Sequence, residues 1–194
     1  MSLDTTSKRI IAVSIIVIIS CFLPWWVLFS EYIPGSGESS YLVFISNPFL
    51  DSFVKFFYFG PEINLFSSML HLNFYKSDAA ASIVLLIAAI ITLIGGVIGI
   101  ISLGNKKIVL IAAAIVLVGV LIYLIGLAVG ELPGLIDPTY FSDNGLNPIF
   151  GTHIRDFGVD EASDTFGISF GPIIAGLAGL ALLILGLKST KNRY

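Results

Sequence analysis

The chain has 194 residues, of which 56% are hydrophobic and only 12% carry a charge. An ordinary soluble domain is about 45–50% apolar and about 25% charged, so the composition excludes a typical soluble protein. The formal net charge is −3, and the acidic residues gather in two segments, which argues against binding of nucleic acid there. We therefore predict an integral membrane protein whose residues 1–194 form a single membrane domain in contact with the lipid bilayer.

Four apolar runs are long enough to cross a bilayer, and none contains Asp, Glu, Lys, Arg, His, Asn or Gln. At about 1.5 Å of rise per residue, each run would span the roughly 30 Å hydrocarbon core as a helix. Lipid offers the backbone no hydrogen-bond partners, so a spanning segment of this kind is expected to be helical. The predicted helices cover residues 10–30, 79–104, 108–130 and 166–187.

The first predicted helix is expected to be a retained signal anchor. Its apolar run continues beyond Cys21 through Pro24, Trp25 and Trp26, whereas the sequence after a cleaved leader would become polar. Trp25 and Trp26 stand at its outer end, where tryptophan typically anchors a helix among lipid headgroups. Cys21 is the single cysteine, so the outer segments must hold their shape without an intramolecular disulfide.

Residues 31–78 are predicted to be an outer loop with structure of its own. Residues 41–45 and 70–74 have the composition or the alternation of β-strands. Apolar residues between them recur at helical spacing over residues 49–57, which favours a short amphipathic helix. The aromatic residues of this stretch are the candidate contact surface: Phe49, Phe53, Phe56, Phe57 and Tyr58. The alternative is that they form the core of the outer layer.

The second and third predicted helices are joined only by Asn105-Lys106-Lys107, so they are expected to form an antiparallel hairpin. Helices in lipid associate where small residues let their backbones approach each other. The candidate packing residues lie four apart in three of the helices: Gly95, Gly99, Gly126, Gly130, Gly167, Gly171, Ala175 and Gly179. These residues fit packing within the bundle, and a dimer interface is the alternative.

Residues 131–165 are predicted to be a second outer loop, ordered but irregular, because turn-forming pairs such as Asn147-Pro148 follow one another closely. Acidic residues cluster toward its end: Asp156, Asp160, Glu161 and Asp164. The spacing of an EF-hand is absent from the sequence. These residues are therefore weak candidates for a divalent-cation site, and a solvated acidic rim is the simpler interpretation.

The distribution of cations predicts that both termini lie in the cytoplasm. Seven of the ten Lys and Arg residues flank one side of the predicted helices: Lys8, Arg9, Lys106, Lys107, Lys188, Lys191 and Arg193. Lys and Arg near helix ends are retained on the cytoplasmic side. We therefore expect a multi-pass protein of the cell membrane with both loops outside. The lack of Gln and the abundance of Ile favour a thermophilic, archaeal source.

No catalytic residue and no cofactor is expected from the sequence. Both histidines, His71 and His153, fall in the predicted outer loops, where neither can ligate a haem within the membrane. The predicted helices contain no carboxylate, amine or imidazole that would line a path for ions or protons. A small oligomeric channel or transporter is therefore the third of the functional interpretations.

The predicted topology resembles that of claudin-type tetraspan proteins. Four spans with both termini inside carry the resemblance, together with Pro24-Trp25-Trp26, the Lys106-Lys107 turn and a glycine-rich fourth helix. The claudin signature of a tryptophan and two cysteines in the first loop is absent, because no Trp or Cys follows residue 26. The resemblance implies a role in adhesion between copies at the cell surface.

These expectations combine into an all-α membrane protein, a four-helix bundle with a small extracellular layer of short β-strands. Its function is expected to be non-enzymatic and to depend on protein contacts. The preferred partner is a larger membrane complex in which the chain is an accessory or structural subunit. The alternative is a self-assembling surface or envelope protein whose partner is another copy of itself.

Overall fold

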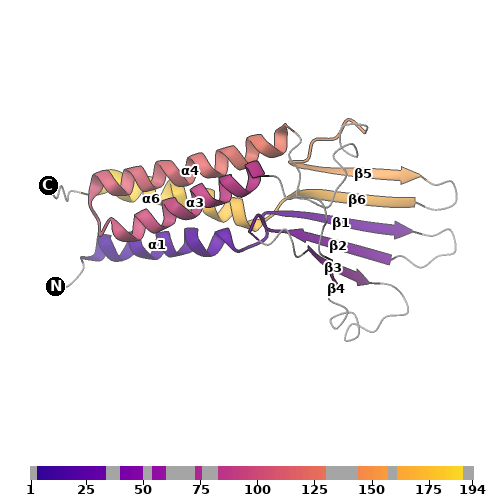
Figure 1. Ribbon diagram of the computed structural model, residues 1–194, viewed down its shortest axis with the longest axis horizontal. Helices are drawn as coiled ribbons and strands as arrows, with labels where there is room; N and C mark the ends of the chain where they lie inside the picture. The colour runs from indigo at the N-terminus through magenta and orange to yellow at the C-terminus, as the bar shows by residue number, and fades with distance from the viewer. Residues whose placement is uncertain are drawn as a thin grey trace. The chain divides into compact units, whose positions relative to one another are not determined.

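The computed structural model describes residues 4–33, 40–49, 54–59, 73–75, 83–129, 144–156 and 161–189. The chain divides into two compact units, one of helices and one of strands (Figure 1). Each unit is assembled from segments that lie far apart in the sequence. The helical unit comprises Met1–Leu23, Ile83–Gly126 and Phe170–Tyr194, and the strand unit comprises Pro24–Ser82 and Leu127–Ser169.

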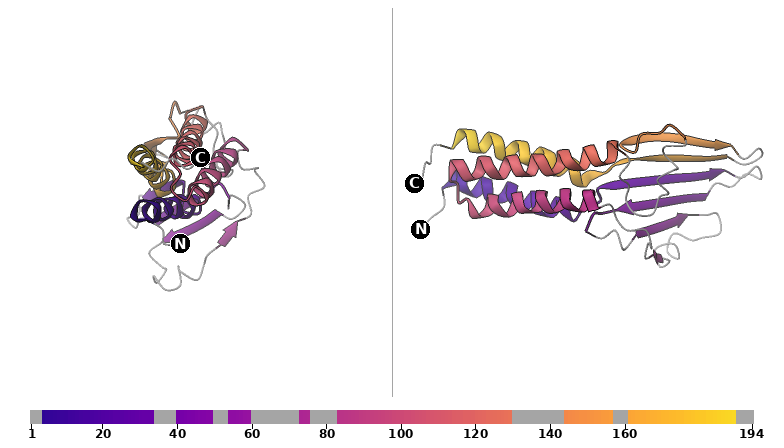
Figure 2. Two further views of the ribbon diagram at one scale, coloured as in Figure 1. Left: turned by 90° about the vertical axis from the view of Figure 1, so that its left-hand side faces the viewer. Right: turned by 45° about the horizontal axis from the view of Figure 1, so that its top comes forward.

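Four helices lie side by side in the helical unit (Figure 2). They are α1 (Thr5–Cys21), α3 (Ile83–Ile101), α4 (Lys106–Ala128) and α6 (Phe170–Lys188). Among the described residues, α3, α4 and α6 are long and apolar enough to cross a membrane, which makes this a membrane protein. α1 has 17 residues, or about 25 Å of helix, and is shorter than the roughly 30 Å hydrocarbon core.

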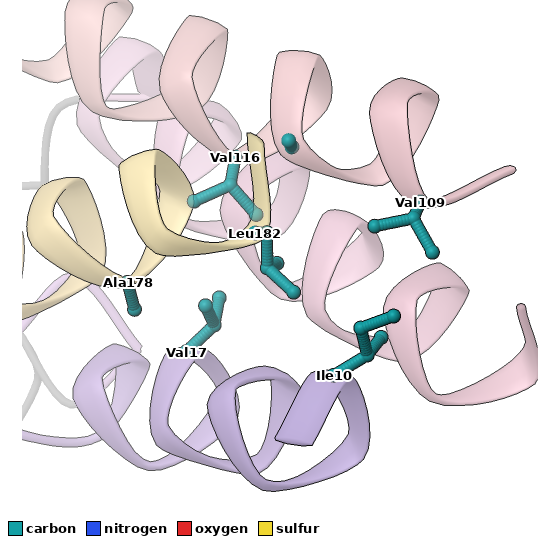
Figure 3. Packing of buried hydrophobic residues seen from close by; sticks show 7 residues of the cluster. Ile10, Val17, Val109, Val116, Ala178 and Leu182 are labelled. Atoms are coloured by element: carbon teal, nitrogen blue, oxygen red, sulfur yellow. The ribbon is translucent and has the colours of Figure 1, made fainter. Parts of the chain in front are cut away.

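The core of the helical unit is formed by α1, α4 and α6 (Figure 3). Its buried members are branched or small residues: Ile10, Val17, Val109, Ala113, Val116, Ala178 and Leu182. Side chains of this kind have few rotamers and pack closely against one another. The three helices therefore share one apolar interior.

Hydrogen bonds tie the chain ends of the bundle to the turn between α3 and α4. Ser7 Oγ donates to the Leu103 carbonyl at 3.1 Å, and Ser189 Oγ donates to the Gly104 carbonyl at 3.1 Å. Gly104 has a φ of +86°, and a Cβ there would meet the Ser7 hydroxyl. The start of α1, the end of α6 and the α3–α4 turn therefore meet at one end of the bundle.

The described residues of the strand unit form one antiparallel sheet of six strands in the order β4-β3-β2-β1-β6-β5. The strands are β1 (Trp26–Ile33), β2 (Ser40–Ser46), β3 (Val54–Phe59), β4 (Asn73–Tyr75), β5 (Phe150–Asp156) and β6 (Glu161–Ile168). β1 lies between β2 and β6, so the segment that follows α1 pairs with the segment that precedes α6.

This sheet overturns the predicted fold class. We expected an all-α membrane protein with a few short strands in a small outer layer, whereas a six-stranded sheet forms a compact unit of its own. The structure is therefore of mixed α and β class. The predicted fold class is wrong for a physical reason. The central pairing joins residues 26–33 to residues 161–168, and no local sequence pattern indicates a pairing between such distant segments.

The first apolar run does not continue as a helix to residue 30. α1 ends at Cys21, and residues 26–30 belong to β1. Pro24 cannot donate a backbone hydrogen bond and disfavours helical backbone at Leu23. The Trp25 N–H donates to the Ser46 carbonyl at 2.9 Å, so neighbouring strands satisfy the backbone that a helix would otherwise satisfy internally.

Two further predicted segments have a different structure. Part of the amphipathic helix expected over residues 49–57 is instead β3, and the irregular loop expected over residues 131–165 contains β5 and most of β6. Four aromatic residues in succession follow Lys55, and such residues favour extended backbone. The predicted strand over residues 41–45 lies within β2, whereas of residues 70–74 only the last two are described, in β4.

Candidate protein-contact surface

Two of the predicted packing glycines bring α3 close to different neighbours. A Cβ added at Gly95 would lie 2.9 Å from the Val116 backbone nitrogen in α4. A Cβ added at Gly99 would lie 3.1 Å from the Ser14 Cβ in α1. Both approaches are too short for any larger residue, so these glycines face the interior of the bundle.

The small residues of α6 are also buried. Gly171, Ala175 and Gly179 are covered within the helical unit. A Cβ added at Gly179 would lie 2.9 Å from Val116 Cγ1 of α4. Gly179 therefore contacts α4 of the same chain.

The remaining small residues of the predicted rows have other positions. Gly167 lies in β6 and not in a helix, and a Cβ added there would lie 3.1 Å from the Ile149 carbonyl oxygen. Gly126 is buried near the end of α4, and Gly130 lies outside the described residues. The row of four therefore does not continue along one helix from Gly167.

The sequence analysis missed Gly119, which lies at the closest approach of α3 and α4. A Cβ added at Gly119 would lie 2.8 Å from both the Ala88 carbonyl oxygen and the Thr92 nitrogen. Because both contacts are with backbone, no side-chain movement can relieve them. A glycine inside a helix lowers its stability by about 1 kcal/mol relative to alanine. An isolated glycine in a long apolar helix therefore indicates a packing role, and this was the signal in the sequence.

Trp25 and Trp26 are not exposed to a surrounding headgroup layer. Both side chains are 0% exposed. The Trp26 Nε1–H donates to the Pro148 carbonyl at 2.8 Å, and its ring stacks on Phe166 with 6.3 Å between the centroids. The predicted membrane anchors are therefore core residues of the strand unit.

The weak cation-site candidates do not converge on one point. Glu161 and Asp164 are three residues apart on β6, so they point to opposite faces of the sheet. Asp156 ends β5 opposite Glu161, and Asp160 lies outside the described residues. Among the residues that the structure describes, no group of His, Cys, Asp and Glu is placed to hold a metal ion.

Asp164 instead forms a two-pronged ion pair with Arg155 of the neighbouring strand. The Arg155 Nε and Nη2 atoms lie 2.9 and 3.0 Å from the two Asp164 carboxylate oxygens. The Asp164 side chain is 4% exposed, whereas that of Arg155 is 39% exposed. One charge-assisted hydrogen bond, from Nη2 to Oδ1, and a close ion-pair contact at Nε therefore join β5 to β6.

Arg155→Ala is expected to destabilise the strand unit by about 1–3 kcal/mol, because a buried carboxylate loses its charged partner and hydrogen-bond donor. Arg155→Lys should have a smaller effect, since an ammonium keeps the charge but not the two-pronged geometry. Chemical denaturation followed by tryptophan fluorescence measures this directly, because Trp25 and Trp26 both lie in the strand unit.

Glu161→Ala is the matched control, since it removes an exposed charge from the same strand pair. We expect its unfolding free energy to stay within about 0.5 kcal/mol of the parent. Equal stability of Arg155→Ala and Glu161→Ala would contradict a stabilising role for the ion pair.

The predicted aromatic contact residues are described only in part. Phe49 follows β2, where its N–H donates to Asn47 Oδ1 at 2.9 Å, and Phe53 lies outside the described residues. The other three residues are consecutive in β3: Phe56, Phe57 and Tyr58. The described part of the structure gives only the backbone of these three residues, so a contact role for their side chains stays a prediction.

The structure shows a different exposed apolar surface, on the strands β1 and β5. We call it the open face and define it by four side chains: Phe29 (39% exposed), Ile33 (40%), Phe150 (76%) and Ile154 (65%). The cross-strand pairing places all four on one side of the sheet. Trp26, Asp164 and Phe166 lie on the other side and are buried.

The buried hydroxyls that the structure describes in the helical unit are all hydrogen-bonded within the chain. Each donates to a backbone carbonyl at 2.6–3.1 Å: Ser7, Ser14, Ser20, Thr92, Ser102 and Ser189. A hydroxyl that is satisfied by its own or a neighbouring turn is not offered to an ion or to water. The described part of the bundle therefore gives no support to a polar path for transport.

The comparisons with known proteins add no relative. No model of a known protein family matches the chain, and no curated protein matches it.

Proposed function

We propose that this is a non-enzymatic structural membrane protein that acts through protein contacts made by its sheet. The open face carries the proposal, since its four exposed apolar side chains share one side of the sheet, on the two strands that flank β6. Exposed apolar residues on one surface typically mark an interface. The helices would hold the chain in the bilayer. The sheet would lie in water, because the N–H and C=O groups along an open sheet edge have no partners in lipid.

The positions of the basic residues support an orientation with both termini in the cytoplasm. Lys8, Arg9, Lys106, Lys107 and Lys188 all lie within the first two turns or the last turn of their helices. These turns belong to the end of the bundle where the chain ends and the α3–α4 turn meet. The proposal places this end at the cytoplasmic surface, as the retention of Lys and Arg requires.

Two forms of contact fit this proposal. The chain is either an accessory subunit of a larger membrane complex or a surface protein that assembles with copies of itself. The edge of the sheet at β5 favours self-assembly, because the outward backbone N–H and C=O groups of this strand can pair with those of β5 in a second copy. The accessory form is the second outcome of the experiment.

Native mass spectrometry of the protein extracted from its own membrane tests the proposal. We expect a defined assembly with integral stoichiometry, and photo-crosslinking from Thr165→Cys should join the same chains. Thr165 is exposed on the open side of β6. Cys21 is buried and provides a low labelling background. A bare monomer whose probe captures only lipid would overturn the proposal.

Lys107→Cys is the matched control, because Lys107 is exposed at the opposite end of the proposed topology. A membrane-impermeant maleimide should label Thr165→Cys in intact cells, and Lys107→Cys only after lysis. The reverse pattern would contradict the proposed orientation.

A further inference from the structure

We propose that two copies of this chain pair edge to edge through β5. The two β5 strands run antiparallel about a twofold axis at Thr152 and join the two sheets into one. The inference rests on the proposed function, because it identifies the partner of the sheet as a second copy of the chain.

β5 is the last strand of the described sheet, and its backbone has a defined outward side. The Ile168 N–H donates to the Ile149 carbonyl at 2.9 Å, so the pair of residues 149 and 168 is hydrogen-bonded. Hydrogen-bonded and non-hydrogen-bonded pairs alternate along an antiparallel ladder. The backbone N–H and C=O of Phe150, Thr152 and Ile154 therefore point away from β6.

The side chains of these three residues also suit an interface. Phe150 and Ile154 are 76% and 65% exposed and lie on the same face as Thr152. The Thr152 hydroxyl lies 3.3 Å from the Thr165 hydroxyl of its own sheet, so it is held in place beside the edge. The strand thus presents apolar, polar and apolar residues in a symmetric order.

This order specifies one register for a second copy. With Thr152 opposite Thr152 of the second copy, Phe150 lies opposite the partner's Ile154, and the reverse pair forms by symmetry. All outward N–H and C=O groups from residue 150 to residue 154 then gain partners. Aromatic and β-branched residues directly opposite each other are favourable pairs in antiparallel sheets.

The neighbouring registers are less favourable. A shift in one direction places Ile154 opposite the partner's Pro148, which has no N–H to donate. A shift in the other direction places Phe150 opposite the partner's Asp156 and brings His153 next to its own copy. Of these three registers, only the one centred on Thr152 pairs both Phe150 and Ile154 with an apolar residue. Identical patches that meet about a twofold axis form a closed dimer.

Cross-linking of Thr152→Cys in the native membrane tests the inference. Residues opposite each other in a hydrogen-bonded pair have Cα atoms about 5.5 Å apart, which lies within the roughly 4.4–6.8 Å range of disulfides. We expect mild oxidation to convert most of this variant into a reducible dimer. Thr165→Cys is the matched control on the same face, about 14 Å from its copy, and should remain monomeric.

A pair of charge variants tests the register. Phe150→Lys combined with Ile154→Lys places like charges opposite each other, whereas Phe150→Glu combined with Ile154→Lys places opposite charges there. In the Thr152→Cys background, we expect the first pair to lower the cross-linking yield by about tenfold or more and the second to retain it. Equal yields in the two variants would overturn the register.

The outcomes also separate this inference from the proposed function. A Thr152→Cys variant that stays monomeric, together with foreign chains in the native mass spectrum, overturns the β5 pairing and leaves the accessory form of the function. Monomers in both experiments overturn both proposals. A cross-linked dimer that follows the charge pattern supports the pairing.

Discussion

Gly119→Ala is expected to destabilise the helical unit by about 3 kcal/mol, the upper end of typical overpacking costs. The added methyl group would lie 2.8 Å from the Ala88 carbonyl oxygen and from the Thr92 nitrogen. Both atoms belong to the α3 backbone, so α3 and α4 must separate along their contact. The loss of packing then exceeds the gain in helix propensity that alanine brings.

Gly176→Ala is the matched control in the same unit. A Cβ there would lie 3.8 Å from Val120 Cγ1, an ordinary contact distance. We expect this variant to be unchanged or stabilised by up to about 1 kcal/mol, because alanine favours the helix. Denaturation in mild detergent, followed by far-ultraviolet circular dichroism, compares the two variants. A neutral Gly119→Ala would contradict the close crossing of α3 and α4.

Trp26→Ala is expected to destabilise the strand unit by about 3–5 kcal/mol, the usual cost of removing a buried aromatic ring. Trp26 is completely buried and stacks on Phe166 at 6.3 Å. Trp26→Phe keeps much of the ring packing but leaves the buried Pro148 carbonyl without its indole donor. That variant should lose about 1–3 kcal/mol.

Trp25 remains as the fluorescent probe in both variants, because it is buried in the same unit. Its emission shifts to longer wavelength when the sheet opens, so chemical denaturation gives the unfolding free energy directly. Phe29→Ala, on the 39% exposed residue of the open face, serves as the control. We expect it to cost less than about 1 kcal/mol. A Trp26→Ala variant as stable as the control would show that the tryptophan is not a core residue.

The sequence located those helices whose backbone hydrogen bonds all form within the helix. The run over residues 79–104 contains α3, and the run over residues 108–130 contains all of α4 except its first two residues. The run over residues 166–187 contains nearly all of α6, but its first three residues belong to β6. Apolar length is sufficient information for such segments, since a helix satisfies its backbone internally. The short connection between α3 and α4 could also be predicted, because few residues separate the two apolar runs.

The candidate contact residues were harder to predict, because exposure in a sheet depends on register. Phe56 and Phe57 belong to a segment that we expected to be helical, and the structure places their backbone in β3. Phe150 and Ile154 belong to a segment that we expected to be an irregular loop. The pairing of β5 with β6 determines which face of the sheet these two side chains occupy, and the sequence does not give that pairing.

The residues alone thus predict a membrane protein with four spanning helices, and in the described residues three of the four are long and apolar enough to span. The tertiary structure decides whether Trp26 to Ser30 continue a helix or form a strand. A strand needs backbone partners from elsewhere in the chain, and β1 finds them in residues 40–46 and 161–168. A local apolar run contains no information about those distant partners, and for this reason the sheet and its open edge followed only from the structure.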